Sequence, residues 1–275
     1  MLDFWIRLLE FFNLKMETPT PYGWFHLMWL GITAVVTVLL CVFGRNKSPR
    51  FVQGLVFGVA AAVALLEVYK QINYTFSVND GSVTADFQWY AFPWQFCSTP
   101  MYVGLLTGLF RKGKVHDALY SYLATYALFA GICVMLYPTS VFVGTIGINI
   151  QTMICHGSMI VVGIYLLAAG YVRLEQKTIL KALPVFAAAV ACAVILNEWA
   201  YFSGLLETDT FNMFFISQYC EPSLPVYSLV QGVLPYPWCL VLYVWGFTTA
   251  SWLILMISMG ISRLAVSHKK IPQIA

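Results

Sequence analysis

The sequence predicts an all-α, polytopic membrane protein that forms one domain over residues 1–275. Of these residues, 60% are hydrophobic and only 10% are charged, whereas a soluble domain has about 25% charged residues. The apolar runs are continuous over about 20 residues, which is the length a helix needs to cross a bilayer. The seven cysteines show no spacing typical of a metal site. We therefore expect the lipid bilayer as the partner of this chain, and no metal, cofactor or nucleic acid.

The first 20 residues predict an amphipathic helix that lies in the membrane interface. In "MLDFWIRLLEFFNLK", Asp3, Arg7 and Glu10 fall on one helical face, and aromatic and aliphatic residues surround them. Seven apolar runs then predict seven transmembrane helices. In chain order these runs cover residues 24–44, 52–73, 94–110, 115–137, 149–172, 179–204 and 236–260.

Lysine and arginine residues predict the orientation of these helices. Three of them lie in each of four alternate segments, at 45–50, 111–114, 173–181 and 263–270. The positive-inside rule places these segments in the cytoplasm, so we expect the N-terminus outside and the C-terminus inside. The outer segment 205–235 is long, carries Glu207, Asp209 and Glu221, and is stiffened by prolines. These features predict a lid over the outer side.

Ionisable side chains inside the predicted spans indicate a functional site, because a charge in hydrocarbon costs about 3 kcal/mol on insertion scales. With the predicted orientation, five spans each place a polar group within about 10 Å of the outer boundary. The groups are His26, Glu67, Cys97, His156 and Glu198, with Lys70 one turn from Glu67. Structural interpretations stay open, namely an interfacial His26, a Glu67–Lys70 ion pair, a hydrogen-bonded His156, and Cys97 as a packing residue with Cys133 and Cys155 as rival thiols.

A cysteine and a histidine at one depth in lipid point to acyl chemistry. Cys97 would pass its thiol proton to His156, and the thiolate would attack an ester carbonyl. Glu67 or Glu198 would orient the imidazole, and Gln95 or backbone amides would stabilise the oxyanion. Because Cys155 precedes His156 directly, we expect its side chain to point about 100° away from this pocket. The hypothesis is a lipid acyltransferase or lipid esterase that acts on membrane phospholipids or other fatty acyl esters.

Two other classes of protein use the same residues differently. Lys70 and Glu67 would form part of a substrate or proton site in a small-molecule or proton-coupled transport or binding protein. No broken helix or inverted repeat is visible in the sequence, which counts against that hypothesis. A dry, paired cluster that is closed to lipid would instead indicate a structural membrane protein.

Three stretches resemble the YwaF / transmembrane protein 164 family of multipass membrane proteins. They are "FPWQFCSTPMYVGLL" at the third span, "ICHGSMIVVGIYLL" in the fifth, and "FNMFFISQYCEPSLPVYSLVQGVLPYPWCLVLY" before the seventh. The resemblance implies lipid acyl transfer between glycerophospholipids, with Cys97 and His156 as the catalytic pair. A distantly similar group uses a threonine nucleophile, which draws attention to Thr99 and Ser98. The family often has a histidine where this chain has Gln95, and Asn-Tyr-Met at 212–214, where this chain has Asn-Met-Phe.

Overall fold

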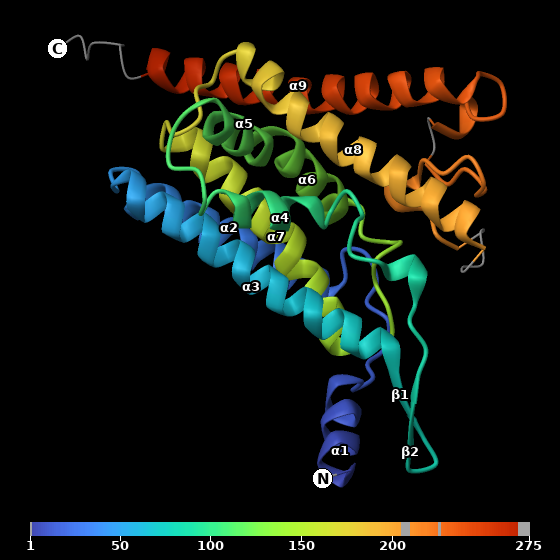
Figure 1. Cartoon of the computed structure of the whole chain (residues 1–275). Helices are drawn as coiled ribbons and strands as arrows, with labels where there is room; N and C mark the ends of the chain where they lie inside the picture. Colours follow the sequence, from blue (N-terminus) through green and yellow to red (C-terminus); the bar gives the residue numbers. More distant parts are fainter. Residues whose placement is uncertain (1, 205–209, 225–226, 269–275) are drawn as a thin grey trace.

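The computed structural model describes residues 2–204, 210–224 and 227–268, and it is mostly helical (Figure 1). Glu207, Asp209, Lys269 and Lys270 lie outside these described residues. The elements are α1 (Leu2–Phe12), α2 (Trp24–Phe43), α3 (Pro49–Thr75), β1 (Phe76–Asn79), β2 (Ser82–Ala85), η1 (Trp89–Ala91), α4 (Thr99–Leu106), α5 (Lys114–Tyr122), the π-helical turn η2 (Leu123–Ala127), α6 (Leu128–Leu136), α7 (Ile146–Ala168), α8 (Lys177–Ser203), η3 (Met213–Phe215), η4 (Tyr227–Leu229) and α9 (Tyr236–His268).

Among the described residues, six helices are long and apolar enough to cross a membrane. They are α2, α3, the continuous run Lys114–Leu136 that joins α5, η2 and α6, then α7, α8 and α9. Local sequence sets their ends. Ser48 caps α3, since its hydroxyl accepts from the Phe51 amide, and Pro49 stands in the first turn. Gly204 ends α8 in the left-handed conformation. Six of the seven predicted spans are therefore confirmed as helices.

The predicted helix over residues 94–110 is wrong. This stretch contains only α4, which is eight residues or about 12 Å long, and residues 92–98 form turns. Pro93 and Pro100 explain the break, because each lacks a backbone N–H and disfavours helix at the residue before it. The chain therefore does contain a discontinuous segment, contrary to the expectation from its hydropathy.

The discontinuous segment, residues 91–107, runs antiparallel to α3. Gln71 near the end of α3 donates to the Ala91 carbonyl at 2.8 Å, and Gln53 near its start donates to the Thr107 carbonyl at 2.6 Å. These glutamines are 18 residues apart, or about 27 Å along the helix axis. Residues 91–107 therefore follow α3 for nearly the thickness of a hydrocarbon core, which is about 30 Å.

Small residues let α4 pack closely on α3. A Cβ atom added at Gly104 would lie 2.6 Å from the Cβ of Ala60, so only glycine fits there. Ala60 is buried. Close backbone approach at small residues is the usual way in which helices associate in lipid.

We expect Gly104→Leu to lower the free energy of unfolding by about 1–3 kcal/mol, because the new side chain has no space against Ala60. Gly58→Leu is the matched control, since its added Cβ meets nothing within 4 Å. Thermal unfolding of both purified variants in the same detergent measures the difference. Equal melting temperatures would contradict the close packing of α3 and α4.

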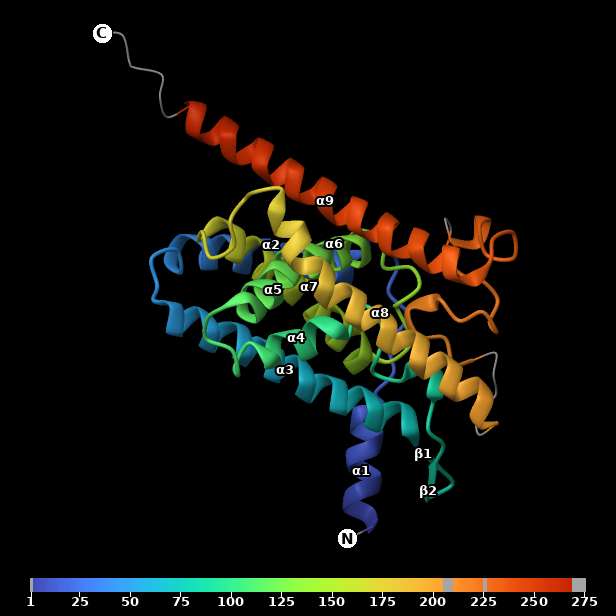
Figure 2. The ribbon, with the colours of Figure 1, turned by 45° about the horizontal axis from the view of Figure 1, so that its top comes forward.

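Helix α7 lies at the centre of the bundle, where it packs against α2, α3 and α6. Of the six long helices, α2 and α9 have the smallest buried share of residues. Helix α1 and the β1–β2 hairpin project from the same end of the molecule in both views (Figures 1 and 2). The hairpin is an element that the all-α prediction missed. Its signal was present, because Asp80-Gly81 joins the strands and both residues have positive φ. Helix α1 forms as predicted, and its place in the membrane interface stays a prediction.

Candidate functional site

A polar cluster lies where α3, the discontinuous segment and α7 meet. Glu67 is 8% exposed and His156 is 5% exposed. The Cys155 thiol of α7 lies 3.8 Å from the Cys97 carbonyl oxygen, and Glu67 of α3 lines a cavity together with Pro93 and Met101 of the discontinuous segment. The three parts of the chain therefore meet at the level of these residues, and a functional convergence of their side chains stays a prediction.

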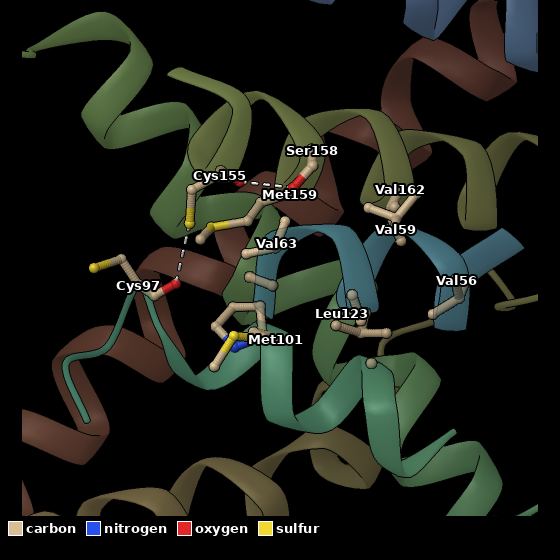
Figure 3. A pocket seen from close by; sticks show the side chains of 14 residues that line it. Val56, Val59, Val63, Cys97, Met101, Leu123, Cys155, Ser158, Met159 and Val162 are labelled. Atoms are coloured by element: carbon tan, nitrogen blue, oxygen red, sulfur yellow. Dashed lines mark hydrogen bonds between the residues drawn. The ribbon is translucent and has the colours of Figure 1, made fainter. Parts of the chain in front are cut away.

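Cys97 lies in the turns before α4, directly beside Cys155 of α7. The Cys155 thiol is 3.8 Å from the Cys97 carbonyl oxygen, and Figure 3 shows the Cys97 thiol turned away from Cys155. Both residues line a small cavity of about 30 Å³, together with Val63, Met101 and Met159. This space has room for about two waters and none for a lipid chain. Cys155 therefore shares the cavity of Cys97, contrary to the prediction, and His156 is not among the described residues that line this cavity.

The His156 imidazole is fixed in one orientation. Its Nδ1 lies 2.8 Å from the Thr152 carbonyl oxygen. A carbonyl only accepts, so Nδ1 must carry the proton and Nε2 must present a bare lone pair. Nε2 is buried and has no hydrogen-bond partner. The second buried histidine differs, because both ring nitrogens of His26 are bonded, to the Tyr22 amide and to the Met135 carbonyl.

The structure does not join the predicted catalytic pair by a hydrogen bond. Since His156 Nε2 has no partner, the Cys97 thiol is not bonded to it. Neither predicted carboxylate orients His156 in the described part of the chain, because the Thr152 carbonyl takes that role. Sequence reasoning missed Thr152 as the orienting residue, although a carbonyl four residues earlier is within reach of any histidine in a helix.

Glu67 and Lys70 form an ion pair inside the membrane region. Lys70 Nζ is 2.7 Å from Glu67 Oε1, and the side chains are 17% and 10% exposed. Gln71 donates to the same carboxylate oxygen at 2.8 Å. The lysine thus has a partner at i−3, and the carboxylate is held by two donors from one helical turn.

We expect Glu67→Leu to lower the free energy of unfolding by about 3–5 kcal/mol, because it leaves the Lys70 ammonium unpaired in a largely buried place. Adding Lys70→Met should recover most of that loss. The exposed pair Glu175–Lys181, 3.1 Å apart, is the control and should couple by no more than about 1 kcal/mol. Double-mutant cycles from denaturant unfolding in micelles give both coupling energies. Equal coupling for the two pairs would contradict a buried role for Glu67.

Gln95 and Thr99 have structural partners. Gln95 accepts from the Phe214 amide at 2.9 Å and donates to the Asn212 carbonyl at 3.0 Å, so its side chain connects the turns near Cys97 to the loop between α8 and α9. Thr99 is 2% exposed, donates to the Phe96 carbonyl at 2.8 Å, and contacts the Tyr122 hydroxyl. Because the Thr99 hydroxyl donates its hydrogen to the Phe96 carbonyl, no adjacent base is placed to take that proton.

Glu198 lies near the end of α8 and bonds residues of the loop between α8 and α9. Its carboxylate accepts from the Gln218 amide at 2.9 Å and from the Tyr219 hydroxyl at 2.7 Å. Burial and the Glu198 carboxylate together raise the pKa of the Tyr219 phenol. The prediction that Glu198 belongs with His156 is therefore not supported by these contacts.

Residues 211–217, which we call the 211–217 loop, are held in the bundle by side-chain amides. The Asn197 side chain bonds both the Met213 amide and the Met213 carbonyl. Phe214 and Phe215 have φ of 58° and 57°, a strained conformation for residues with a Cβ atom. Sequence reasoning missed Asn197; an asparagine in an apolar span was the signal.

A larger cavity shares Met101 with the small one. It has a volume of about 420 Å³ and is lined by Glu67, Gln71, Pro93, Met101 and Tyr102. Met101 also lines the cavity of Cys97. The two cavities therefore share one flexible side chain.

These features define an integral membrane protein with a helical bundle, a discontinuous segment, a Glu67–Lys70 ion pair and a buried histidine on the central helix. The chain belongs to the TMEM164 family, whose profile matches residues 21–256. The match includes the discontinuous segment and the polar cluster. No curated protein and no solved structure matches this chain.

Proposed function

We propose that this protein transfers or hydrolyses the acyl chain of a membrane lipid ester, with Cys97 as the nucleophile and His156 as the base. The observation that carries this proposal is the His156 imidazole, whose proton is fixed on Nδ1 by the Thr152 carbonyl and whose buried Nε2 is without a partner. A bare imidazole nitrogen in an apolar interior is costly to maintain, and it has the lone pair that a general base needs.

The reaction proceeds through a thioester. His156 Nε2 takes the proton of the Cys97 thiol, and the sulfur forms a bond to the ester carbonyl carbon. The C–O bond to the lipid alcohol then breaks, and that oxygen takes the proton from Nε2. A second lipid hydroxyl, or water, gives its proton to Nε2, attacks the thioester and releases the Cys97 thiolate, which recovers the proton.

The thiol and the imidazole must approach each other before the first step. Cys97 lies in turns, not in a helix, and its carbonyl, not its thiol, faces Cys155. A rotation about its Cα–Cβ bond moves the sulfur without disturbing α4. Catalytic hydrogen bonds are often open in the absence of substrate and close when it binds.

The lipid ester enters through the cavity of about 420 Å³ between α3 and the discontinuous segment. This volume is in the usual range for a small-molecule site. Rotation of Met101 joins it to the cavity at Cys97. The Lys70 ammonium stabilises the developing oxyanion. The Gln95 amide does not take this role, because it is bonded to the 211–217 loop.

Trapping of the acyl-enzyme tests the proposal directly. Purified protein is incubated with a phospholipid that has a fluorescent acyl chain, quenched in acid, and split into samples with and without hydroxylamine. We expect a hydroxylamine-sensitive label that mass spectrometry locates on Cys97. A label on Cys155 or Thr99, or turnover without any covalent label, would overturn the assignment of the nucleophile.

A transport or binding protein is the second candidate, and the discontinuous segment favours it. Broken helices at membrane depth are typical of transporters, in which their free backbone groups bind substrate or ions. The Glu67–Lys70 pair would then be the substrate or proton site. Proteoliposome flux that is lost in Glu67→Gln but retained in Cys97→Ala would support this candidate over the acyl-transfer one.

The discontinuous segment also completes a seventh crossing, with the N-terminus outside and the C-terminus in the cytoplasm. Its two ends meet opposite ends of α3, which supports a crossing over a hairpin that returns to the same face. Epitope tags at Gly81 and Gly113, both in turns with positive φ, test this in sealed vesicles. We expect antibody access to the two tags from opposite faces; access from one face would contradict the crossing.

A further inference from the structure

The largest of the described cavities is not used by the proposed reaction. It is a groove of about 680 Å³ between α4, α5 and α8. Helix α5 packs against both α8 and α4, and Figure 2 shows the three helices side by side. Its walls are mostly apolar and include Trp94, Val103, Leu119, Val185 and Ala188.

Charged side chains stand at one end of the groove only. Lys114 and Asp117 come from the first turn of α5, and Lys181 comes from near the start of α8. Asp117 contacts His116 at 3.0 Å, and Lys181 contacts Glu175 at 3.1 Å. Within the described residues, no ion pair is present for Lys114. Ammonium groups have several donors, so both lysines can still bind a phosphate.

The length of the groove matches one leaflet. From Lys181 to Cys192, which line its two ends along α8, the helix rises by about 16 Å. Half of a hydrocarbon core of about 30 Å is about 15 Å. The charged end lies where α5 and α8 begin. Leu106 also lines the groove, next to the Thr107 that Gln53 contacts near one end of α3. An acyl chain that starts at the headgroup level therefore ends at Trp94 and Thr99.

We propose that this groove binds a glycerophospholipid, with its phosphate at Lys114 and Lys181 and an acyl chain between α4 and α8. The charge of the groove's mouth complements an anionic phosphate, and its apolar walls fit a chain of one leaflet. Trp94 fixes the far end, because its indole N–H donates to the Ala189 carbonyl of α8 at 3.3 Å. Tyr102 lines both this groove and the cavity at Glu67, so the bound lipid lies next to the segment that carries Cys97.

Tryptophan quenching measures this binding in the full-length protein. The probes are a phosphatidylglycerol and a diacylglycerol with the same brominated chains, added to protein in a neutral detergent. The difference in quenching between wild type and Trp94→Phe isolates the groove from the other tryptophans. We expect the phosphatidylglycerol to bind roughly 10- to 30-fold more tightly than the diacylglycerol, since each lysine near a headgroup contributes about 1 kcal/mol.

Two double variants and the single variant Ala188→Trp decide the outcome. Lys114→Gln/Lys181→Gln should remove the preference for phosphatidylglycerol, while Lys112→Gln/Lys177→Gln removes the same charge from neighbouring exposed positions and should retain it. Ala188→Trp fills the groove and should weaken both probes. Equal loss of preference in the two double variants, unchanged binding in Ala188→Trp, or quenching that Trp94→Phe does not alter would overturn the proposal. Because the readout is binding, it stands or falls independently of acyl transfer.

Discussion

Replacing Cys97 by alanine is expected to lower phospholipid turnover at least about 10³-fold, because loss of a covalent nucleophile removes the thioester route. Cys155→Ala should retain most activity, although Cys155 lines the same small cavity. The pair is closely matched, since both cysteines line one cavity and the Cys155 thiol lies 3.8 Å from the Cys97 carbonyl oxygen. Initial rates with a fluorescent phospholipid, normalised to folded protein, give the comparison.

The reverse pattern, with activity lost in Cys155→Ala and retained in Cys97→Ala, would move the nucleophile to α7. Thr99→Val checks the remaining candidate. Its hydroxyl bonds the Phe96 carbonyl, so the substitution should lower stability by about 1 kcal/mol and leave the rate per folded molecule unchanged. A loss of rate at unchanged stability would identify Thr99 as the nucleophile instead.

Replacing His156 by glutamine is expected to lower the rate by about 10²- to 10⁴-fold, which is the usual contribution of a general base. Stability should fall by no more than about 1 kcal/mol, because Nε2 has no partner and the one hydrogen bond at risk is that from Nδ1 to the Thr152 carbonyl. His26 is the matched histidine. Both of its nitrogens are bonded and it is fully buried, so His26→Ala should lower the free energy of unfolding by about 1–3 kcal/mol and spare the rate.

Measured together, unfolding in detergent and initial rates separate the two histidines. If His156→Gln destabilised the protein as much as His26→Ala and left the rate per folded molecule intact, His156 would be a structural histidine. The proposal requires opposite effects, on rate for His156 and on stability for His26.

Most of the bundle could be predicted from hydropathy, because the lengths of apolar runs are set by bilayer thickness. Residues 94–110 are the exception. Their composition is as apolar as that of a transmembrane helix, but Pro93 and Pro100 interrupt the helix. Hydropathy averaged over the length of a span changes little with two residues. The hairpin after α3 was missed for the same reason, because its signal is the short Asp80-Gly81 turn.

The candidate site could be predicted by residue type and depth but not by contact. Depth along a helix follows from counting residues, and it places Glu67 beside Lys70 and Cys97 beside α7, as the structure has them. Direction around each helix depends on how the helices pack, so Cys155 was wrongly excluded and Glu198 was wrongly included. Backbone partners such as the Thr152 carbonyl have no residue type to recognise, and they are invisible to any pattern of side chains.

The 211–217 loop has a consequence for how the protein is made. Gln95, two residues before Cys97, is held by residues 117 and 119 positions later in the chain. A ribosome therefore delivers Cys97 long before it delivers the residues that hold Gln95. While α8 is entering the membrane, the turns around Cys97 still lack these two hydrogen bonds. These turns can therefore reach their final form only near the end of synthesis.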